Sequence, residues 1–270
     1  IVNSDERQWT WMDEGLNSFV EILAELDYDP NFFTGNLPKD IVGYMGGDQS
    51  NLSPIMTQGE AAKQFGPNAY TKPAAGLYML RQTIMGPELF DFAFRTYARR
   101  WMFKHPTPAD FFRTMEDASA MNLDWFWRGW FYTTDYTDIG VKEVKQFHLT
   151  DKPTEKAKKL AKRYNMDLNQ YVNKLIYFEE GVGDGQAKKA MDFDVVKKHL
   201  AKMTPAEREA LKKAPNYFYE VTFEKPGGLV MPIIVEIEYE DGTKERQTYP
   251  AQIWMKNDKE VKKVYRTSQK

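Results

Sequence analysis

The sequence lacks cysteine, and it also lacks any long uncharged apolar run. Without cysteine, disulfides, thiol catalysis and cysteine-ligated metal sites are all excluded. No apolar run approaches the roughly 18 residues that a membrane-spanning helix needs, so we expect no membrane span. The absence of cysteine leaves the compartment open, because secreted and periplasmic proteins can also dispense with disulfides.

The sequence also lacks an excess of charge of either sign, since 37 basic and 39 acidic residues give a formal net charge of −2. That balance gives no general electrostatic attraction to nucleic acid or to an anionic membrane. The basic run at 156–163 has acids interleaved around it and no aromatic stacking platform, so it indicates a solvated helix face. His105, His148 and His199 are widely spaced, and none has a partner at metal-ligand spacing. We therefore expect no nucleic-acid partner and no metal site made of these histidines.

Three catalytic motifs are absent from the sequence: a phosphate-binding glycine loop, a GxSxG elbow and HExxH. What is present is a chain of 270 residues of which 42% are hydrophobic and 14% aromatic. Such a chain is long enough for one large domain or two smaller ones with a sizeable core.

Hydrophobic periodicity changes at about residue 137. Before it, apolar spacing and helix-starting prolines predict helices at 8–28, 73–85, 87–103, 107–120 and 122–132. An irregular connection at 29–57 separates the first helix from the others. From 216 onward, alternation predicts antiparallel strands with "EDGTK" as a hairpin turn, joined by a strand at 141–150. We expect an α+β fold, with a helical domain at 1–137 and a β-rich domain at 138–270 that carries a charged helical insertion at about 151–214.

The segment "WTWMDEGLNSFVE" (9–21) holds an anomaly. Helical spacing predicts a core stripe made of Trp9, Met12, Leu16, Phe19, Leu23 and Leu26. The opposite, polar face carries Glu14, Asn17, Ser18, Glu21 and Glu25. On this pattern alone Glu14 is a solvent-facing carboxylate. Gly15 argues against that interpretation, because a mid-helix glycine costs about 1 kcal/mol relative to alanine. A ligand or a second helix close to the backbone would explain the missing side chain.

The same segment resembles the third zinc-ligand segment of the aminopeptidase N and leukotriene hydrolase family of gluzincins. Glu14, Gly15, Phe19 and Glu21 match the pattern of that family. The resemblance implies that Glu14 is a zinc ligand and that Glu21 is a neighbouring carboxylate orienting a ligand histidine. It also implies that both histidines and the general-base glutamate of HExxH precede Ile1, so that the chain is a C-terminal fragment, inactive alone.

A second stretch, "NAYTKPAAGLYMLRQTIM", resembles the Tyr-x-Lys-Gly segment of the same family. The resemblance implies that Tyr70 donates a hydrogen bond to the developing oxyanion, with Lys72 as the adjoining lysine. Pro73 replaces the usual glycine, so we expect a helix to start there, with Tyr70 on the loop before it. Without the resemblance, Tyr70 would be interpreted as a packing aromatic.

A third stretch, "HPTPADFFRTMEDASAMNLDWFWRGWFY", resembles the segment that ends in the Trp-rich helix of the family. This implies that Arg128 lies near the substrate cleft, and a surface or structural arginine is the equal alternative.

The resemblance covers residues 1–137 and implies the helical C-terminal part of a thermolysin-like catalytic domain, followed by a small antiparallel β-sandwich-like domain. It implies a zinc-dependent aminopeptidase that hydrolyses N-terminal peptide bonds, with zinc as cofactor. A peptide substrate and the upstream catalytic half of the same protein are the implied partners. The alternative is a non-catalytic helical scaffold or peptide-binding module with an attached β-domain.

Overall fold

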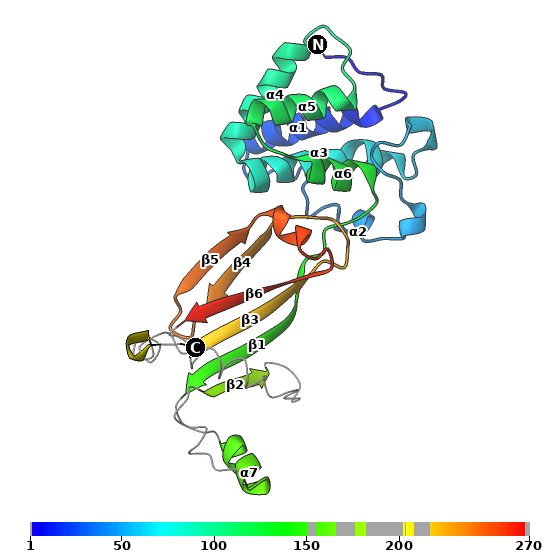
Figure 1. Cartoon of the computed structure of the whole chain (residues 1–270). Coiled ribbons are helices and arrows are strands. Elements are labelled where there is room, and N and C mark those ends of the chain that lie inside the picture. The colour runs from blue at the N-terminus through cyan, green and yellow to red at the C-terminus, as the bar shows by residue number, and fades with distance from the viewer. Residues whose placement is uncertain are drawn as a thin grey trace. The chain divides into compact units, whose positions relative to one another are not determined.

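The computed structural model describes residues 2–150, 155–165, 176–181, 202, 204–207 and 217–267. The chain divides into two compact units: unit 1 holds Ile1–Asp138 with Lys225–Pro232, and unit 2 holds Ile139–Glu224 with Ile233–Lys270. Unit 1 carries the large helices, and unit 2 carries the antiparallel sheets (Figure 1). The α+β class predicted from the sequence is confirmed.

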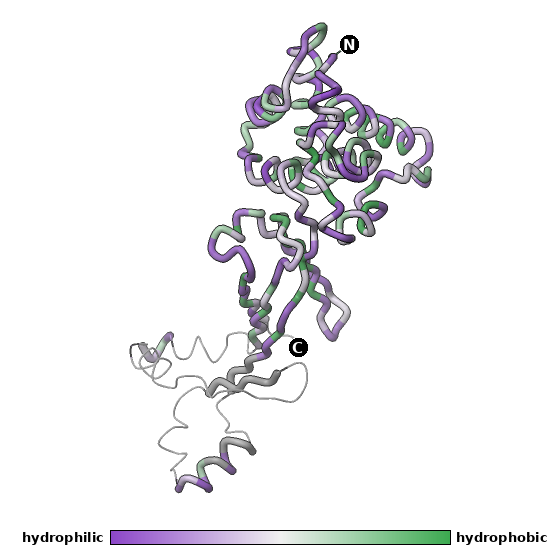
Figure 2. The backbone as a smooth tube through the Cα atoms, turned by 90° about the vertical axis from the view of Figure 1, so that its right-hand side faces the viewer, coloured by the Kyte–Doolittle hydropathy of each residue, from purple (hydrophilic) through white to green (hydrophobic). Residues whose placement is uncertain are grey.

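The described residues of unit 1 form six α-helices, joined by shorter turns and irregular segments. They are α1 (Glu14–Tyr28), α2 (Val42–Met45), α3 (Lys72–Met79), α4 (Pro87–Trp101), α5 (Pro108–Ser119) and α6 (Asp124–Tyr132). Hydrophobic and hydrophilic residues interleave along the chain in this unit (Figure 2), as expected of amphipathic helices around a shared core. The centre of that core is aromatic, with ring contacts that join Trp11, Phe111, Phe112, Phe126, Trp127 and Phe131.

The buried face of α1 differs from the predicted stripe. Its buried residues are Gly15, Ser18, Phe19 and Ile22. The helix begins only at Glu14, after a 3-10 turn η1 (Thr10–Met12). Since a 3-10 turn has about three residues per turn, it shifts the phase of everything after it relative to a continuous α-helix. Within α1, Ser18 shares a face with Gly15 and Ile22, so this residue, predicted on the polar face, is 5% exposed.

The described residues of unit 2 form two antiparallel sheets. One has the strand order β2-β1-β3-β6, and the other pairs β4 with β5. The strands are β1 (Gly140–Thr150), β2 (Ile176–Gly181), β3 (Tyr217–Glu224), β4 (Ile233–Glu238), β5 (Lys244–Tyr249) and β6 (Glu260–Thr267). The strand predicted at 141–150 pairs with β3, from Gly140 opposite Glu224 to His148 opposite Tyr217. The predicted hairpin turn is confirmed, because Tyr239 N–H donates to Thr243 O between β4 and β5.

The charged tract 151–214 is not wholly helical, which corrects the prediction. It contains the helix α7 (Glu155–Arg163) and also β2, which pairs with β1 from Lys145 opposite Gly181 to Thr150 opposite Ile176. Hydrogen bonding to an existing strand provides a reason for an extended conformation that local composition does not reveal. The remainder of the tract lies mostly outside the described residues.

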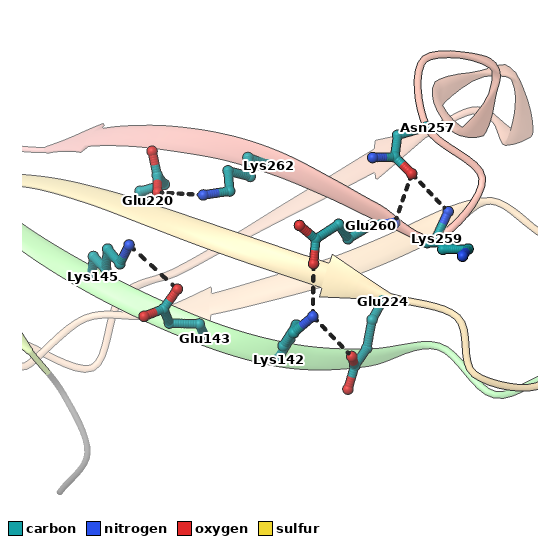
Figure 3. A network of polar contacts seen from close by, with 9 residues as sticks. All are labelled: Lys142, Glu143, Lys145, Glu220, Glu224, Asn257, Lys259, Glu260 and Lys262. Carbon is teal, nitrogen blue, oxygen red and sulfur yellow. Dashed lines mark hydrogen bonds and ion pairs between the residues drawn. The ribbon is translucent and has the colours of Figure 1, made fainter.

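Charged side chains on β1, β3 and β6 pair across the strands (Figure 3). Lys142 Nζ lies 2.7 Å from Glu260 Oε2 and 3.9 Å from Glu224 Oε2. Lys262 Nζ lies 3.3 Å from Glu220 Oε1. Cross-strand pairs of opposite charge favour one register over its neighbours.

Within the described part of the chain, no helix combines the length and apolar character needed to cross a membrane.

Candidate active site

Glu14 is held in place by the 3-10 turn just before it, which carries the buried Trp11. Trp11 is 1% exposed and its ring stacks on Phe112 at 5.8 Å and contacts Phe131 at 4.7 Å. The 3-10 turn that carries Trp11 leads directly into α1, whose first residue is Glu14. Because the indole is locked in the aromatic core, the start of α1 and the half-buried Glu14 carboxylate have a fixed position.

Gly15 allows α3 to pack closely on α1. A Cβ at Gly15 would lie 2.5 Å from Pro73 Cγ and 3.0 Å from Ala69 O. Distances that short are not tolerated between a Cβ and a backbone or ring atom, so only glycine fits. Of the two explanations open from the sequence, a second helix near the backbone is the one observed, and the glycine accommodates Pro73 itself.

Tyr70 lies in a π-helical turn, η4 (Pro67–Thr71), which runs without a break into α3. The prediction that Tyr70 sits on a loop before a helix starting at Pro73 is therefore wrong. Proline has no N–H and clashes with the carbonyl four residues earlier in an α-helix, which here is Ala69 O. The wider π turn accommodates Pro73 inside a continuous helical run, and such turns are frequent at functional sites.

Asn68 holds the same turn from one side. It is 2% exposed, and its Nδ2 donates to Ser53 O at 2.8 Å and to Pro54 O at 3.2 Å. These bonds tie η4 to the irregular connection after α1. The buried amide is thus satisfied by backbone carbonyls, as a buried polar group requires.

The structure brings Glu14 and Tyr70 together. The pKa of Tyr70 is raised, first by its interaction with the neighbouring Glu14 side chain, then through partial burial and the charges of Glu14 and Asp13. A second aromatic ring, that of Phe65, meets the Tyr70 ring edge-on at 6.3 Å. At neutral pH the Tyr70 hydroxyl is therefore a protonated donor beside a carboxylate.

The two other predicted site residues stand apart from this pair. Glu21 is exposed on α1, on the same side as Glu14 but two turns further, about 10 Å along the axis. Arg128 is exposed on α6. In the parts of the chain that the structure describes, neither joins Glu14 or Tyr70 through a hydrogen bond or an ion pair.

The metal-binding capacity of the described residues is incomplete. Glu14 offers a half-buried carboxylate that forms no ion pair with a described lysine or arginine, so it is a suitable oxygen donor. A protein zinc site needs three or four nitrogen, oxygen or sulfur donors. Among the described residues, however, no group of three or more His, Cys, Asp or Glu side chains could hold a metal ion. These residues alone do not fit a complete zinc site.

Lys72 is a functional candidate that the sequence did not single out by itself. It is 2% exposed, and burial lowers its pKa to about 8, against the opposing charge of Asp135. A lysine directly before the apolar run "PAAGLYML" was the available signal, because lysine is almost never fully buried unless paired.

Comparisons with known proteins agree with the resemblance inferred from the sequence. Residues 1–130 match the family model described as the peptidase family M1 domain. Over 152 residues the chain is 27% identical to glutamyl aminopeptidase from Homo sapiens, an alignment that covers 54% of this chain and 16% of that protein. The chain thus spans about a sixth of the length of that curated relative. The predicted resemblance to the aminopeptidase family is confirmed for this segment.

Proposed function

We propose that this chain contributes Glu14 as a zinc ligand and Tyr70 as a transition-state donor to a zinc aminopeptidase that removes N-terminal residues from peptides. The single observation that supports this most directly is the proximity of Tyr70 to Glu14, the residue that does most to raise the Tyr70 pKa. The match to the peptidase family over residues 1–130 supports the reaction class. The thermolysin-like architecture remains part of the same proposal.

The remaining zinc donors and the general base come, in this proposal, from residues outside the 270 of this sequence. Zinc, when bound, polarises a scissile carbonyl and lowers the pKa of a bound water. Glu14 supplies one anionic oxygen from a backbone position fixed by Trp11. Glu21, two turns along α1, would orient a ligand histidine, and Arg128 would line the peptide cleft.

The contribution of Tyr70 follows from its protonation and its position. A tyrosine has an ordinary pKa of about 10, so the Tyr70 hydroxyl keeps its proton throughout the neutral range and can donate to a developing oxyanion. A donor that meets its acceptor only in the transition state accelerates the reaction without tightening substrate binding. The turn that carries Tyr70 is fixed by Asn68 and Pro73, which supports pre-organisation of the donor.

The test uses the longer protein that contains this sequence. Tyr70→Phe removes one hydroxyl and keeps the ring, so zinc content should stay constant while kcat falls by about 10²–10³-fold with little change in KM. Glu14→Gln should lose zinc and activity together. Elemental analysis and hydrolysis of an aminoacyl anilide measure both.

Two matched controls accompany these variants. Tyr28→Phe alters a tyrosine on α1 that is 87% exposed, and Glu88→Gln alters the glutamate in the first turn of α4. Neither should change zinc content or kcat. Retention of kcat within about threefold in Tyr70→Phe would make Tyr70 a packing residue, since a lost donor costs far more. Absence of zinc and of hydrolysis in the unmutated longer protein would instead favour a non-catalytic scaffold or peptide-binding module.

A further inference from the structure

The Lys72 side chain makes a long-range buried contact. Its Nζ donates to Thr133 O at 3.2 Å, and Thr133 is the residue that caps the C-terminus of α6. Free carbonyls at a helix C-terminus attract cations, so the ammonium is well matched to its acceptor. Lys72 is also the first residue of α3, two positions after Tyr70. The contact therefore joins the turn that carries Tyr70 to the end of α6.

The backbone of Lys72 is held by the same helix. Trp130 Nε1 donates to Lys72 O at 3.0 Å, and the Trp130 ring is 1% exposed. Gly76 lets the indole approach, because a Cβ there would lie 1.8 Å from Trp130 Nε1. Lys72 is thus fixed to α6 through its side chain and through its carbonyl, from two residues that lie on successive turns.

Among the residues that the structure describes, the ammonium has few other polar neighbours. Asp135 is the charged group that acts on Lys72, and its carboxylate lies against Gly228, where a Cβ would be 3.0 Å from Asp135 Cγ. Burying an ammonium with few acceptors is costly, and a methionine of similar length would fill the same space without that cost. Packing alone therefore does not explain a lysine here, whereas a directional contact to Thr133 O does.

We infer that Lys72 is the positioning residue for Tyr70: it ties the π turn Pro67–Thr71 to the C-terminus of α6 and so sets the direction of the Tyr70 hydroxyl. The inference rests on the proposed function for the role of Tyr70, and on the geometry alone for the tie itself. Lys72 acts through the backbone of the turn and needs no contact with substrate. Loss of the tie should move Tyr70 while leaving the aromatic core in place.

The experiment places 3-fluorotyrosine throughout the chain of 270 residues and records fluorine NMR spectra. The signal that disappears in Tyr70→Phe identifies Tyr70. In Lys72→Met this signal should shift and broaden, while most of the other tyrosine signals stay unchanged and so report a folded chain. Lys104→Met is the matched control, because Lys104 Nζ also donates to a carbonyl near a helix C-terminus, Arg100 O at 2.9 Å, but is exposed. It should leave the Tyr70 signal unmoved.

A second variant covers the case in which Lys72→Met fails to fold. Trp130→Phe keeps a six-membered aromatic ring and removes the donor to Lys72 O together with part of the indole, so it should shift the Tyr70 signal in the same direction. An unmoved Tyr70 signal in a folded Lys72→Met, or in Trp130→Phe when Lys72→Met does not fold, would overturn the inference.

In the longer protein, Lys72→Met should lower kcat at least tenfold and leave KM and zinc content unchanged. A shifted signal with unchanged kcat would uphold the tie and count against the proposed function of Tyr70, so the two failures are distinguishable.

Discussion

Two lysines, one in each unit, show how burial decides what a polar contact does. Lys72 in unit 1 is 2% exposed, donates to a single carbonyl, and has a pKa lowered to about 8 by burial. The Lys142 side chain in unit 2 is 51% exposed and faces two glutamates, and its pKa is raised, first by the hydrogen bond to Glu260. The lysine with more partners is the one whose removal should change the pH dependence of stability less. Water already satisfies Lys142, whereas Lys72 depends on the protein for every contact.

The largest effect is expected where the packing around Lys72 is tightest. Gly76→Ala puts a methyl into the Trp130 ring, because the new Cβ would lie 1.8 Å from Nε1. Overpacking of this kind should lower the free energy of unfolding by about 3 kcal/mol. Chemical denaturation measures the change.

Gly43→Ala is the control for that substitution, since nothing lies within 4 Å of a Cβ at this helical position. It should leave the free energy of unfolding unchanged or raise it by about 0.5–1 kcal/mol. Equal effects of the two alanines would mean that the indole moves freely and that Lys72 is not held by it.

The next effect is a dependence of stability on pH. The folded pKa of Lys72 is about 8 against an ordinary 10.5, so between these values the unfolded chain binds the proton and the folded chain does not. The free energy of unfolding therefore rises with pH across this window, by about 3 kcal/mol in total, and the cost of burying the ammonium is fully present below it.

Lys72→Met should abolish this contribution and should be as stable as the unmutated chain, or more stable, at neutral pH. Denaturant unfolding of both proteins through the same pH series gives the difference, in which the tyrosines and other titrating groups cancel. If the free energy of unfolding varied with pH in the same way in both proteins, Lys72 would titrate as an exposed lysine does.

The smallest effect is expected on the exposed sheet of unit 2. Lys142→Met should lower the Tm only slightly, and high salt should erase the difference, because exposed ion pairs are screened. The folded pKa of Lys142 is raised, so its contribution is present below the ordinary lysine pKa and is lost as the pH rises through the folded value. Thermal unfolding at low and high salt checks both statements. A loss as large as that of Gly76→Ala would reverse the comparison between the two lysines.

Local pattern was sufficient for the parts of the fold in which neighbours in sequence decide. The aromatic run "DWFWRGWFY" predicts an aromatic-rich helix, and α6 is one, with Phe126, Trp127, Trp130 and Phe131 buried. The hairpin between β4 and β5 follows from Asp241 and Gly242, which has a φ of 83°. In both cases the sequence itself carries the periodicity or the turn chemistry.

The site depended on contacts between distant residues, which local pattern does not contain. The proximity of Glu14 and Tyr70 was available only through the family resemblance, since each residue alone has an ordinary explanation. The π turn at Tyr70 accommodates Pro73, and Pro73 in turn packs against Gly15 of another helix. The buried Lys72 ammonium needs a hydrogen-bond acceptor, and that acceptor is the carbonyl of Thr133, in a distant part of the chain. Strand β2 was not predicted, because the short run "LIYFEE" lies within a tract rich in charged residues.

The segment Lys225–Pro232 limits how evolution or protein engineering can exchange parts of this chain. It follows β3 and precedes β4, yet it belongs to unit 1. There Gly228 forms a β-bridge with Tyr136, and Leu229 is 2% exposed. A gene segment ending at Asp138 would therefore encode the helices without Leu229, which lies against Gly129 of α6. Recombination at that point would leave an uncovered apolar patch on the transferred helices. It would also leave the segment Lys225–Pro232 without the helical surface on which it packs. Viable chimaeras should keep both segments from one parent.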